Sequence, residues 1–405
     1  MSRVLSRLMT VLGVLLVAAG GPAFGKDYGP GVSDTEIKIG QTAPLSGPGT
    51  AFSVFPKAAT AYFRMLNERG GINGRKINLI VADDGYSPPK TVDQTRRLVE
   101  DENVFAVFMA VGTANSIAVR KYLNGKKVPQ LFVTSGASAF GNYKEYPWSI
   151  GWGPTFTIEG TAFATYILKT TPNAKIALLY QNDDFGKEYL IGLQKGLGDK
   201  AATMIVRTQS YELTDPTIDS QIIALKASGA DTLILATTPK FGAQAIRQVH
   251  DIGWRPATFM SYASASVTQV MQPAGIERGM GVISSVFHKD PSDPLWHDDK
   301  GYRDWIAFME KYYPDGSRVD VLNVVGYNMA MTLAQVLQQC GDTLTRENVM
   351  REATRLDIQL PMVVDGIRVK TSSTNFYPIR SLRLARFDGK SFRLFGDMVS
   401  VPEDR

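Results

Sequence analysis

The sequence lacks the features that mark several common classes of protein. Its 405 residues contain one cysteine, Cys340, so an internal disulfide bond is excluded. Cys340 lies in an apolar helical run, where we expect a buried structural thiol. No C-x-x-C, H-E-x-x-H or G-x-x-x-x-G-K-[ST] pattern occurs, so zinc and nucleotide chemistry have no support. The formal charge of +5 is evenly spread and too weak to indicate a nucleic-acid-binding surface.

An apolar run of membrane-spanning length is also missing. Residues 1–25 have the pattern of a secretory signal, with Arg3 and Arg7 ahead of an apolar core too short to span a bilayer. Small residues before the cut predict cleavage between Gly25 and Lys26. Removing the two arginines lowers the charge from +5 to +3. We therefore expect an exported, soluble, periplasmic protein, without a lipid anchor because no cysteine lies near the cut.

The stretch from Val104 to Arg120 predicts a strand, a tight turn and the start of a helix. Residues 104–110 are seven apolar residues in a row, which is typical of a strand buried on both faces. Gly112 permits the turn, and Thr113 begins a run of good helix-capping residues. The unpaired backbone N–H groups and the positive dipole end of such a helix favour an anion such as a carboxylate.

The same pattern returns about twenty residues later. The apolar run 128–133 is followed by T-S-G-A-S at 134–138. Two such units place small polar residues at the carboxyl edge of a parallel sheet, where ligands bind in open α/β folds. Beyond Trp152 a second series of alternating strands and helices predicts a second doubly wound lobe. The fold class is therefore α/β, and the tail is expected to form a hairpin at Asp388-Gly389.

Three motifs together resemble a known family. They are D-T-E-I-K-I-G-Q-T-A-P-L-S-G-P, L-N-E-R-G-G-I-N-G-R-K-I and Y-Q-N-D-D-F-G-K-E. The chain resembles the periplasmic leucine/isoleucine/valine-binding protein family, the type I solute-binding components of ABC transporters, over almost all of its mature length. The resemblance implies two Rossmann-like lobes, joined by three hinge crossovers, that close on a ligand between them.

The resemblance also implies a domain plan and partners. Residues 34–152 and 286–375 are expected to form the first lobe, and residues 153–285 and 376–400 the second. The partners would be a small carboxylate ligand and the membrane permease of an ABC transporter. No cofactor, metal, nucleic acid or catalytic activity is expected, and we expect a monomer.

The site residues follow from the resemblance position by position. Thr113 corresponds to a serine that binds the ligand carboxylate through its hydroxyl and backbone. Ser135 and Ala137 correspond to the second carboxylate loop, where Ser138 could replace a threonine hydroxyl that Ala137 lacks. Aromatic residues that correspond to the cleft, or that lie at a crossover, are Phe52, Trp152, Phe185, Tyr262 and Tyr327.

Two departures from the family bear on the ligand. Ala263 stands where amino-acid binders have the glutamate that holds the ligand ammonium, and Thr238 replaces a tyrosine that assists it. Burying an unpaired ammonium costs roughly several kcal/mol. The sequence therefore predicts a carboxylate without an α-amino group, and the aromatic residues favour an aromatic or aryl-alkyl acid. The family's disulfide is also absent, because Tyr86 and Gly112 occupy its two positions.

Other functions stay open at this point. A branched-chain or other amino-acid-binding protein of the same family is one, and a periplasmic ligand sensor is another. A serine hydrolase would need Ser135 or Ser138 as nucleophile and His250, His288 or His297 as base. The segment S-G-A-S-A-F-G lacks the G-x-S-x-G pattern. His288 and His297 lie in polar loops, where we expect surface or capping roles.

Overall fold

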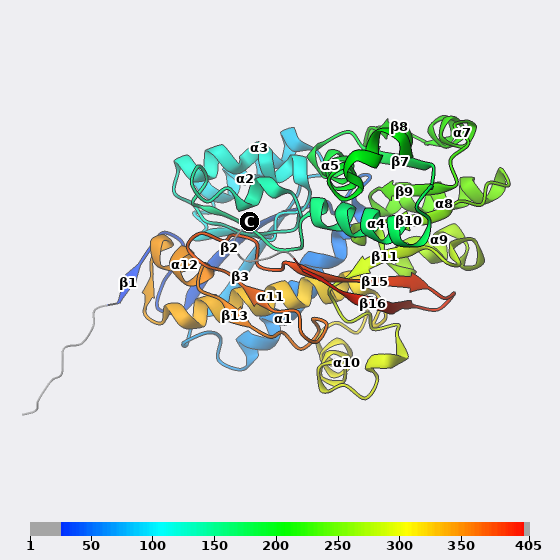
Figure 1. The fold of residues 1–405 in the computed structure, drawn as a ribbon. Helices are drawn as coiled ribbons and strands as arrows, with labels where there is room; N and C mark the ends of the chain where they lie inside the picture. The colour runs from blue at the N-terminus through cyan, green and yellow to red at the C-terminus, as the bar shows by residue number, and fades with distance from the viewer. Residues whose placement is uncertain (1–25, 401–405) are drawn as a thin grey trace, which may run out of the picture.

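The computed structural model describes residues 26–400, so the predicted signal segment lies outside the described residues. Figure 1 shows two lobes side by side, each built around its own β-sheet with helices against it. Within residues 26–400, no helix is both long and apolar enough to cross a membrane.

The first lobe contains a five-stranded parallel sheet in the order β3-β2-β4-β5-β6. Its core explains the apolar run at 104–110. Val107 faces Leu98 of one helix layer, while Phe108 faces the opposite layer. The strands are β2 (Glu36–Ala43), β3 (Lys76–Asp83), β4 (Ala106–Phe108), β5 (Gln130–Val133) and β6 (Ser149–Gly151).

Two helix layers cover this sheet. α2 (Pro88–Glu100) and α3 (Thr113–Gly125) pack together on one face. α1 (Val54–Glu68) packs against α11 (Val321–Cys340) on the other face, so a late segment of the chain completes the first lobe. The remaining helices of this part are α10 (Lys300–Tyr312) and α12 (Arg346–Ala353). Cys340 is buried at the end of α11, and burial raises the pKa of its thiol to about 12.

The second lobe contains a seven-stranded sheet in the order β16-β15-β11-β10-β9-β7-β8. Strands β7 to β11 are parallel, and the antiparallel hairpin β15–β16 extends the sheet beyond β11. The predicted hairpin is therefore confirmed. Its strands are β7 (Ile176–Gln181), β8 (Ile205–Tyr211), β9 (Thr232–Ala236), β10 (Ala257–Met260), β11 (Ile283–Val286), β15 (Ser381–Phe387) and β16 (Phe392–Ser400).

The helices of the second lobe follow its strands in alternation. The larger ones are α4 (Phe156–Thr170), α5 (Asp184–Leu197), α7 (Asp219–Ala227) and α8 (Pro239–Asp251), and the short ones are α6 (Ala201–Met204) and α9 (Gln272–Ala274). Two small strand pairs lie outside the main sheets: β1 (Asp27–Tyr28) with β12 (Thr343–Leu344), and β13 (Asp357–Ile358) with β14 (Val369–Lys370).

The chain passes between the two sheets three times. It leaves the first sheet after β6, returns to the first lobe after β11, and enters the second sheet again at β15. This topology agrees with the predicted fold class of two α/β lobes joined by three crossovers. The individual boundary residues of the predicted domain plan stay predictions.

Candidate ligand-binding site

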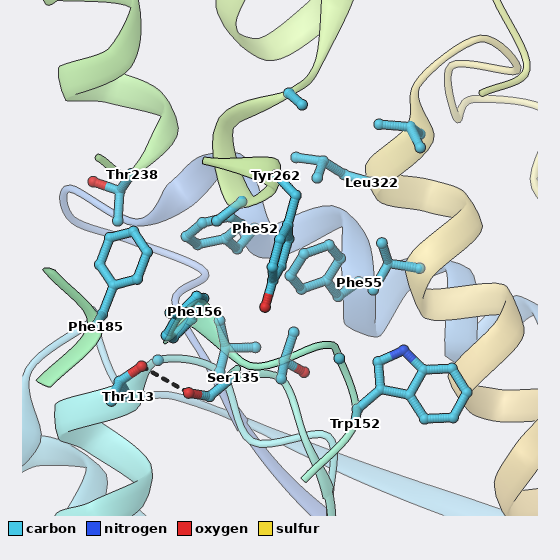
Figure 2. Close-up of a pocket in the computed structure, with 18 of the residues that line it drawn as sticks. Phe52, Phe55, Thr113, Ser135, Trp152, Phe156, Phe185, Thr238, Tyr262 and Leu322 are labelled. Carbon is cyan, nitrogen blue, oxygen red and sulfur yellow. Dashed lines mark hydrogen bonds between the residues drawn. The ribbon is translucent and has the colours of Figure 1, made fainter. Parts of the chain in front are cut away.

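A cavity of about 100 Å³ lies between the lobes, on the scale of the ~150 Å³ apolar cavity that accommodates benzene. Both lobes contribute to its lining: Phe52 and Thr113 come from the first lobe, and Phe185 and Tyr262, also labelled in Figure 2, come from the second. Eight aromatic side chains take part: Phe52, Phe55, Tyr86, Trp152, Phe156, Phe185, Tyr262 and Phe287.

A pair of hydroxyls forms one polar end of the cavity. Thr113 is the first residue of α3 and Ser135 follows β5, and their Oγ atoms are 2.7 Å apart (Figure 2). The backbone N–H of Ala137 donates to Ser135 Oγ at 3.0 Å. Since α3 begins at the cavity, its free N–H groups and its dipole add to the positive potential there. This end is suited to a carboxylate.

The turn before α3 depends on a glycine. Gly112 has φ 99°, which side chains with a Cβ atom rarely adopt. A Cβ at this position would lie 2.7 Å from the ring of Tyr86. Tyr86 therefore packs closely on Gly112, and it forms part of the cavity wall.

Aromatic rings from both lobes form the walls. Phe52 stacks on Phe55 with centroids 5.3 Å apart in the first lobe. In the second lobe, Phe156 stacks on Tyr262 at 5.7 Å and meets Phe185 edge-on at 4.7 Å. Such pairs hold one another in fixed orientations and contribute about 0.5–1.5 kcal/mol each beyond their buried area. The walls are suited to a flat apolar body.

No charged side chain faces this space. Among the described residues that line the cavity, none is Asp, Glu, Lys or Arg, and both Ala263 and Thr238 belong to the lining. Glu159 of α4 is a buried carboxylate that contacts the lining residues Ser285 and Tyr262, and protein donors occupy it. It accepts from Ser285 Oγ at 2.6 Å, from the Tyr262 N–H at 3.0 Å and from the Tyr189 hydroxyl. Burial raises its pKa to about 7.

The structure brings six of the nine residues expected at the site to the cavity. These six are Phe52, Thr113, Ser135, Trp152, Phe185 and Tyr262. The others have different surroundings. Ala137 contacts Ser135 and not the cavity, because its backbone N–H donates to Ser135 Oγ. Ser138 donates to Glu188 of the second lobe, with its N–H at 2.7 Å and its hydroxyl at 2.6 Å.

Tyr327 is the third expected site residue that does not line the cavity. It lies in α11 inside the core of the first lobe, where its ring packs against Phe308 at 4.7 Å and Tyr62 at 5.3 Å. An aromatic residue near a hinge is compatible both with a ligand contact and with core packing. The family pattern does not distinguish the two, because it does not specify which side of the helix faces the ligand.

His288 corrects an expectation. We expected a surface or capping role from its polar sequence surroundings, but it is 4% exposed and lines the cavity. The polar residues after it, Lys289 and Asp290, are themselves buried and paired. Phe156, Phe287 and Leu322 were also missed. Only Phe156 had a sequence signal, since it follows the predicted crossover at Trp152.

The serine hydrolase alternative gains no support from this geometry. The Ser135 hydroxyl is bonded to Thr113 and the Ser138 hydroxyl to Glu188, so both have partners other than a histidine. Among residues 26–400, no group of three His, Cys, Asp or Glu side chains is placed to hold a metal ion.

The fold and the site together define a two-lobed α/β binding protein that encloses a small ligand between its lobes. A family model described as periplasmic binding protein matches residues 36–391, and the chain belongs to this family. The resemblance inferred from the sequence is thus confirmed. Members of the family are periplasmic solute-binding proteins, not enzymes. They bind small ligands and deliver them to the permeases of ABC transporters.

Two relatives are named as leucine/isoleucine/valine-binding protein homologues. Homolog 3 of Brucella melitensis is 28% identical over 234 residues, covering 54% of this chain and 59% of the relative. Homolog 7 of Brucella suis is 21% identical over 390 residues, covering 93% of this chain and 96% of the relative. The second alignment shows that the likeness extends through both lobes.

Solved structures share the fold at lower identity. A substrate-binding periplasmic protein from Ralstonia solanacearum has a TM-score of 0.80 at 23% identity, covering 89% of this chain and all of its own (100%). A branched-chain amino acid ABC transporter protein from Thermus thermophilus with bound valine has a TM-score of 0.80 at 15% identity, covering 91% of this chain and 98% of its own. A solute-binding protein from Rhodopseudomonas palustris in complex with 3,4-dihydroxybenzoic acid has a TM-score of 0.77 at 16% identity, covering 92% of this chain and 99% of its own.

Proposed function

We propose that this protein binds a small carboxylate that lacks an α-amino group, most closely an aromatic or aryl-alkyl acid, and delivers it to an ABC importer. The observation that carries the proposal is the chemistry of the cavity lining. It offers hydroxyl and backbone donors at one end, aromatic walls, and no acidic side chain.

The donor end accounts for the carboxylate. The hydroxyls of Thr113 and Ser135 can each rotate to donate to a ligand oxygen, and the start of α3 adds backbone donors. Hydrogen bonds to a charged group contribute about 1.5–3 kcal/mol each. A carboxylate can therefore be held here without a lysine or arginine.

The absence of an acidic partner argues against an amine. An ammonium in this cavity would lose its hydration and find no carboxylate in the lining, which costs roughly several kcal/mol. Glu159 cannot serve directly, because protein donors already occupy both of its oxygens. Ala263 and Thr238 line the cavity where the family resemblance has the ammonium ligands.

The family contains ligands of both kinds. One structural relative holds valine and another holds 3,4-dihydroxybenzoic acid. The acid-binding relative agrees better with the lining of this cavity, since its ligand has a carboxylate and an aromatic ring but no amine.

Matched ligand pairs test the proposal. We expect 3-phenylpropionate to raise the melting temperature where phenylalanine does not, and the same order for isocaproate and leucine. A ligand at 100 times its Kd stabilises the folded state by about 2.7 kcal/mol. Strong shifts with leucine or valine, and none with acids that lack an amine, would overturn the proposal.

The carboxylate role of Thr113 has its own variant test. Thr113→Val keeps the shape of the side chain and removes its hydroxyl, so we expect about 10- to 100-fold weaker binding of any acid by titration calorimetry. Thr165→Val is the matched control, because the Thr165 hydroxyl is exposed and bonds only within α4. Unchanged affinity in the Thr113 variant would remove this residue from the site.

Export and assembly belong to the same proposal. We propose cleavage between Gly25 and Lys26, release into the periplasm and action as a monomer. N-terminal sequencing of the exported protein and its elution volume in gel filtration check these points. A role as sensor instead of transport component would appear as ligand-dependent binding to a receptor and normal uptake in a deletion strain.

A further inference from the structure

The cavity has a second set of polar atoms, at the hinge side. Trp152 and His288 are 2% and 4% exposed and both line the cavity. Among the buried side-chain atoms of residues 26–400 that lack a hydrogen-bond partner, two belong to lining residues, and these are Trp152 Nε1 and His288 Nε2. Buried polar atoms are rarely left unpaired in folded proteins, and because these two belong to lining residues they are candidates for a ligand contact.

Both atoms are hydrogen-bond donors. An indole nitrogen can only donate. For His288, the side-chain amide nitrogen of Asn328 lies 3.0 Å from Nδ1. With the Asn328 amide oriented as in the structure, its nitrogen donates to Nδ1, so the proton of the neutral ring sits on Nε2. Burial lowers the pKa of His288 to about 3, so the ring is neutral at physiological pH.

The two donors belong to the same region of the cavity. Trp152 follows β6 and His288 comes shortly after β11, so each lies where the chain crosses between the lobes. Helix α11 contacts His288 itself and a lining residue at the end of the strand next to β6. Its Asn328 bonds His288, and its Met329 sulfur lies 3.8 Å from the hydroxyl of Thr134. Thr134 also lines the cavity and follows β5, the strand that pairs with β6 just before Trp152.

This region is separate from the carboxylate end. Figure 2 shows Thr113 and Trp152 on opposite sides of the cavity, with Tyr262 between them in this view. A ligand held by its carboxylate at Thr113 and Ser135 would extend its other end toward Trp152.

We propose that Trp152 and His288 form a second polar subsite that binds a neutral oxygen, a hydroxyl or a carbonyl, at the end of the ligand away from its carboxylate. This inference rests on the proposed function and narrows its ligand class to hydroxy- or oxo-substituted aromatic acids. A second carboxylate fits less well, because it would add a second negative charge to a cavity whose described lining residues include no lysine or arginine.

The experiment compares each acid with its hydroxylated counterpart. Titration calorimetry is run with phenylacetate and 4-hydroxyphenylacetate, and with benzoate and 4-hydroxybenzoate. We expect at least one hydroxylated acid to bind about 10-fold tighter than its parent, the size expected for one net hydrogen bond. In Trp152→Phe, the ratio between the two affinities should fall toward one, whatever the smaller ring does to the affinity of the parent acid.

The controls separate the subsite from packing effects. Trp254→Phe is a matched change, because the Trp254 nitrogen is buried but donates to Ala230 O at 3.1 Å, and it should leave all affinities unchanged. His288→Gln is the second variant if Trp152→Phe does not fold. Its amide can still donate, so it should keep part of the advantage, whereas His288→Leu should lose it.

The possible failures are distinguishable. If the parent acids bind and hydroxylation gives no advantage, or if Trp152→Phe weakens parent and hydroxylated acids equally, the second subsite is overturned and the proposed function stands. If no acid binds and amino acids do, the proposed function itself has failed.

Discussion

Glu159 is a buried carboxylate that forms hydrogen bonds with second-lobe residues of the cavity lining. Its Oε1 accepts from Ser285 Oγ and from the Tyr262 N–H, so one side chain positions two residues of the cavity lining. Burial outweighs these hydrogen bonds and raises its pKa from an ordinary value of 4.5 to about 7. The carboxyl is therefore linked to the stability of the fold as well as to the geometry of the site.

This shift predicts a pH dependence. Between pH 4.5 and 7 the folded protein keeps the Glu159 proton and the unfolded chain has released it. Stability from this group therefore falls as pH rises through that window, by up to about 3 kcal/mol. We expect Glu159→Gln to lose less stability than the natural protein between pH 5 and pH 8, measured by urea unfolding.

A surface carboxylate serves as the control for this prediction. Glu212 is exposed and bonds Asn182 at 2.6 Å, so Glu212→Gln should keep the full pH dependence of the natural protein. Equal slopes in the natural protein and in Glu159→Gln would contradict the assigned role of Glu159.

At the scale of elements, the packing of α4 against α5 depends on glycines. A Cβ at Gly192 of α5 would lie 2.4 Å from the Thr157 carbonyl oxygen and 3.0 Å from the Cα of Gly160. The two helices therefore approach backbone to backbone. They carry Phe156, Glu159 and Phe185, so their spacing sets the width of the aromatic wall.

Gly192→Ala should force these helices apart. Alanine improves helix propensity by about 0.8–1 kcal/mol, but overpacking of this kind costs typically about 1–3 kcal/mol, so we expect net destabilisation and weaker ligand binding. Gly125→Ala is the control, because a Cβ there has no atom within 4 Å, and it should be neutral or slightly stabilising. Urea unfolding of both variants measures the change in stability. A Gly192→Ala protein as stable as the natural one would contradict the close backbone packing of α4 and α5.

At the scale of the whole molecule, the lobes meet across the cavity through Ser138 and Glu188. Both the N–H and the hydroxyl of Ser138 donate to Glu188 Oε1. Sequence comparison had proposed Ser138 as a ligand contact, but its surroundings fit a contact that holds the lobes together. Ligand binding and lobe closure are then linked, because closure lowers the free energy of the bound form.

Ser138→Ala tests this link. It removes one of the two hydrogen bonds from Ser138 to Glu188 and keeps the one from the backbone N–H, so we expect a roughly 3- to 10-fold loss of affinity, similar for every ligand. Ser220→Ala, at an exposed hydroxyl of the second lobe, should change nothing. The measurement is titration with two different acids. If one acid is weakened and the other is not, Ser138 contacts the ligand instead.

The order of elements and the position of the Thr113 and Ser135 hydroxyls, where we propose that a carboxylate binds, were accessible from the sequence, because both depend on local patterns. The apolar run at 104–110 and the turn at Gly112 predicted a helix start near Thr113, and α3 begins at Thr113. The loop after β5 brings Ser135 beside it because parallel strands end at one edge. Family motifs then identified the overall architecture.

What only the tertiary structure decided is which side chains face the ligand. Met109 and Phe132, next to these loops, have φ values of 51° and 52° that bulky residues rarely adopt, and no local pattern signals them. His288 is buried by packing against α11, forty residues later in the chain. Burial and unpaired atoms arise from contacts between distant segments and from the meeting of two lobes. Local periodicity does not encode such contacts, so the hinge-side donors at Trp152 and His288 emerged only from the folded molecule.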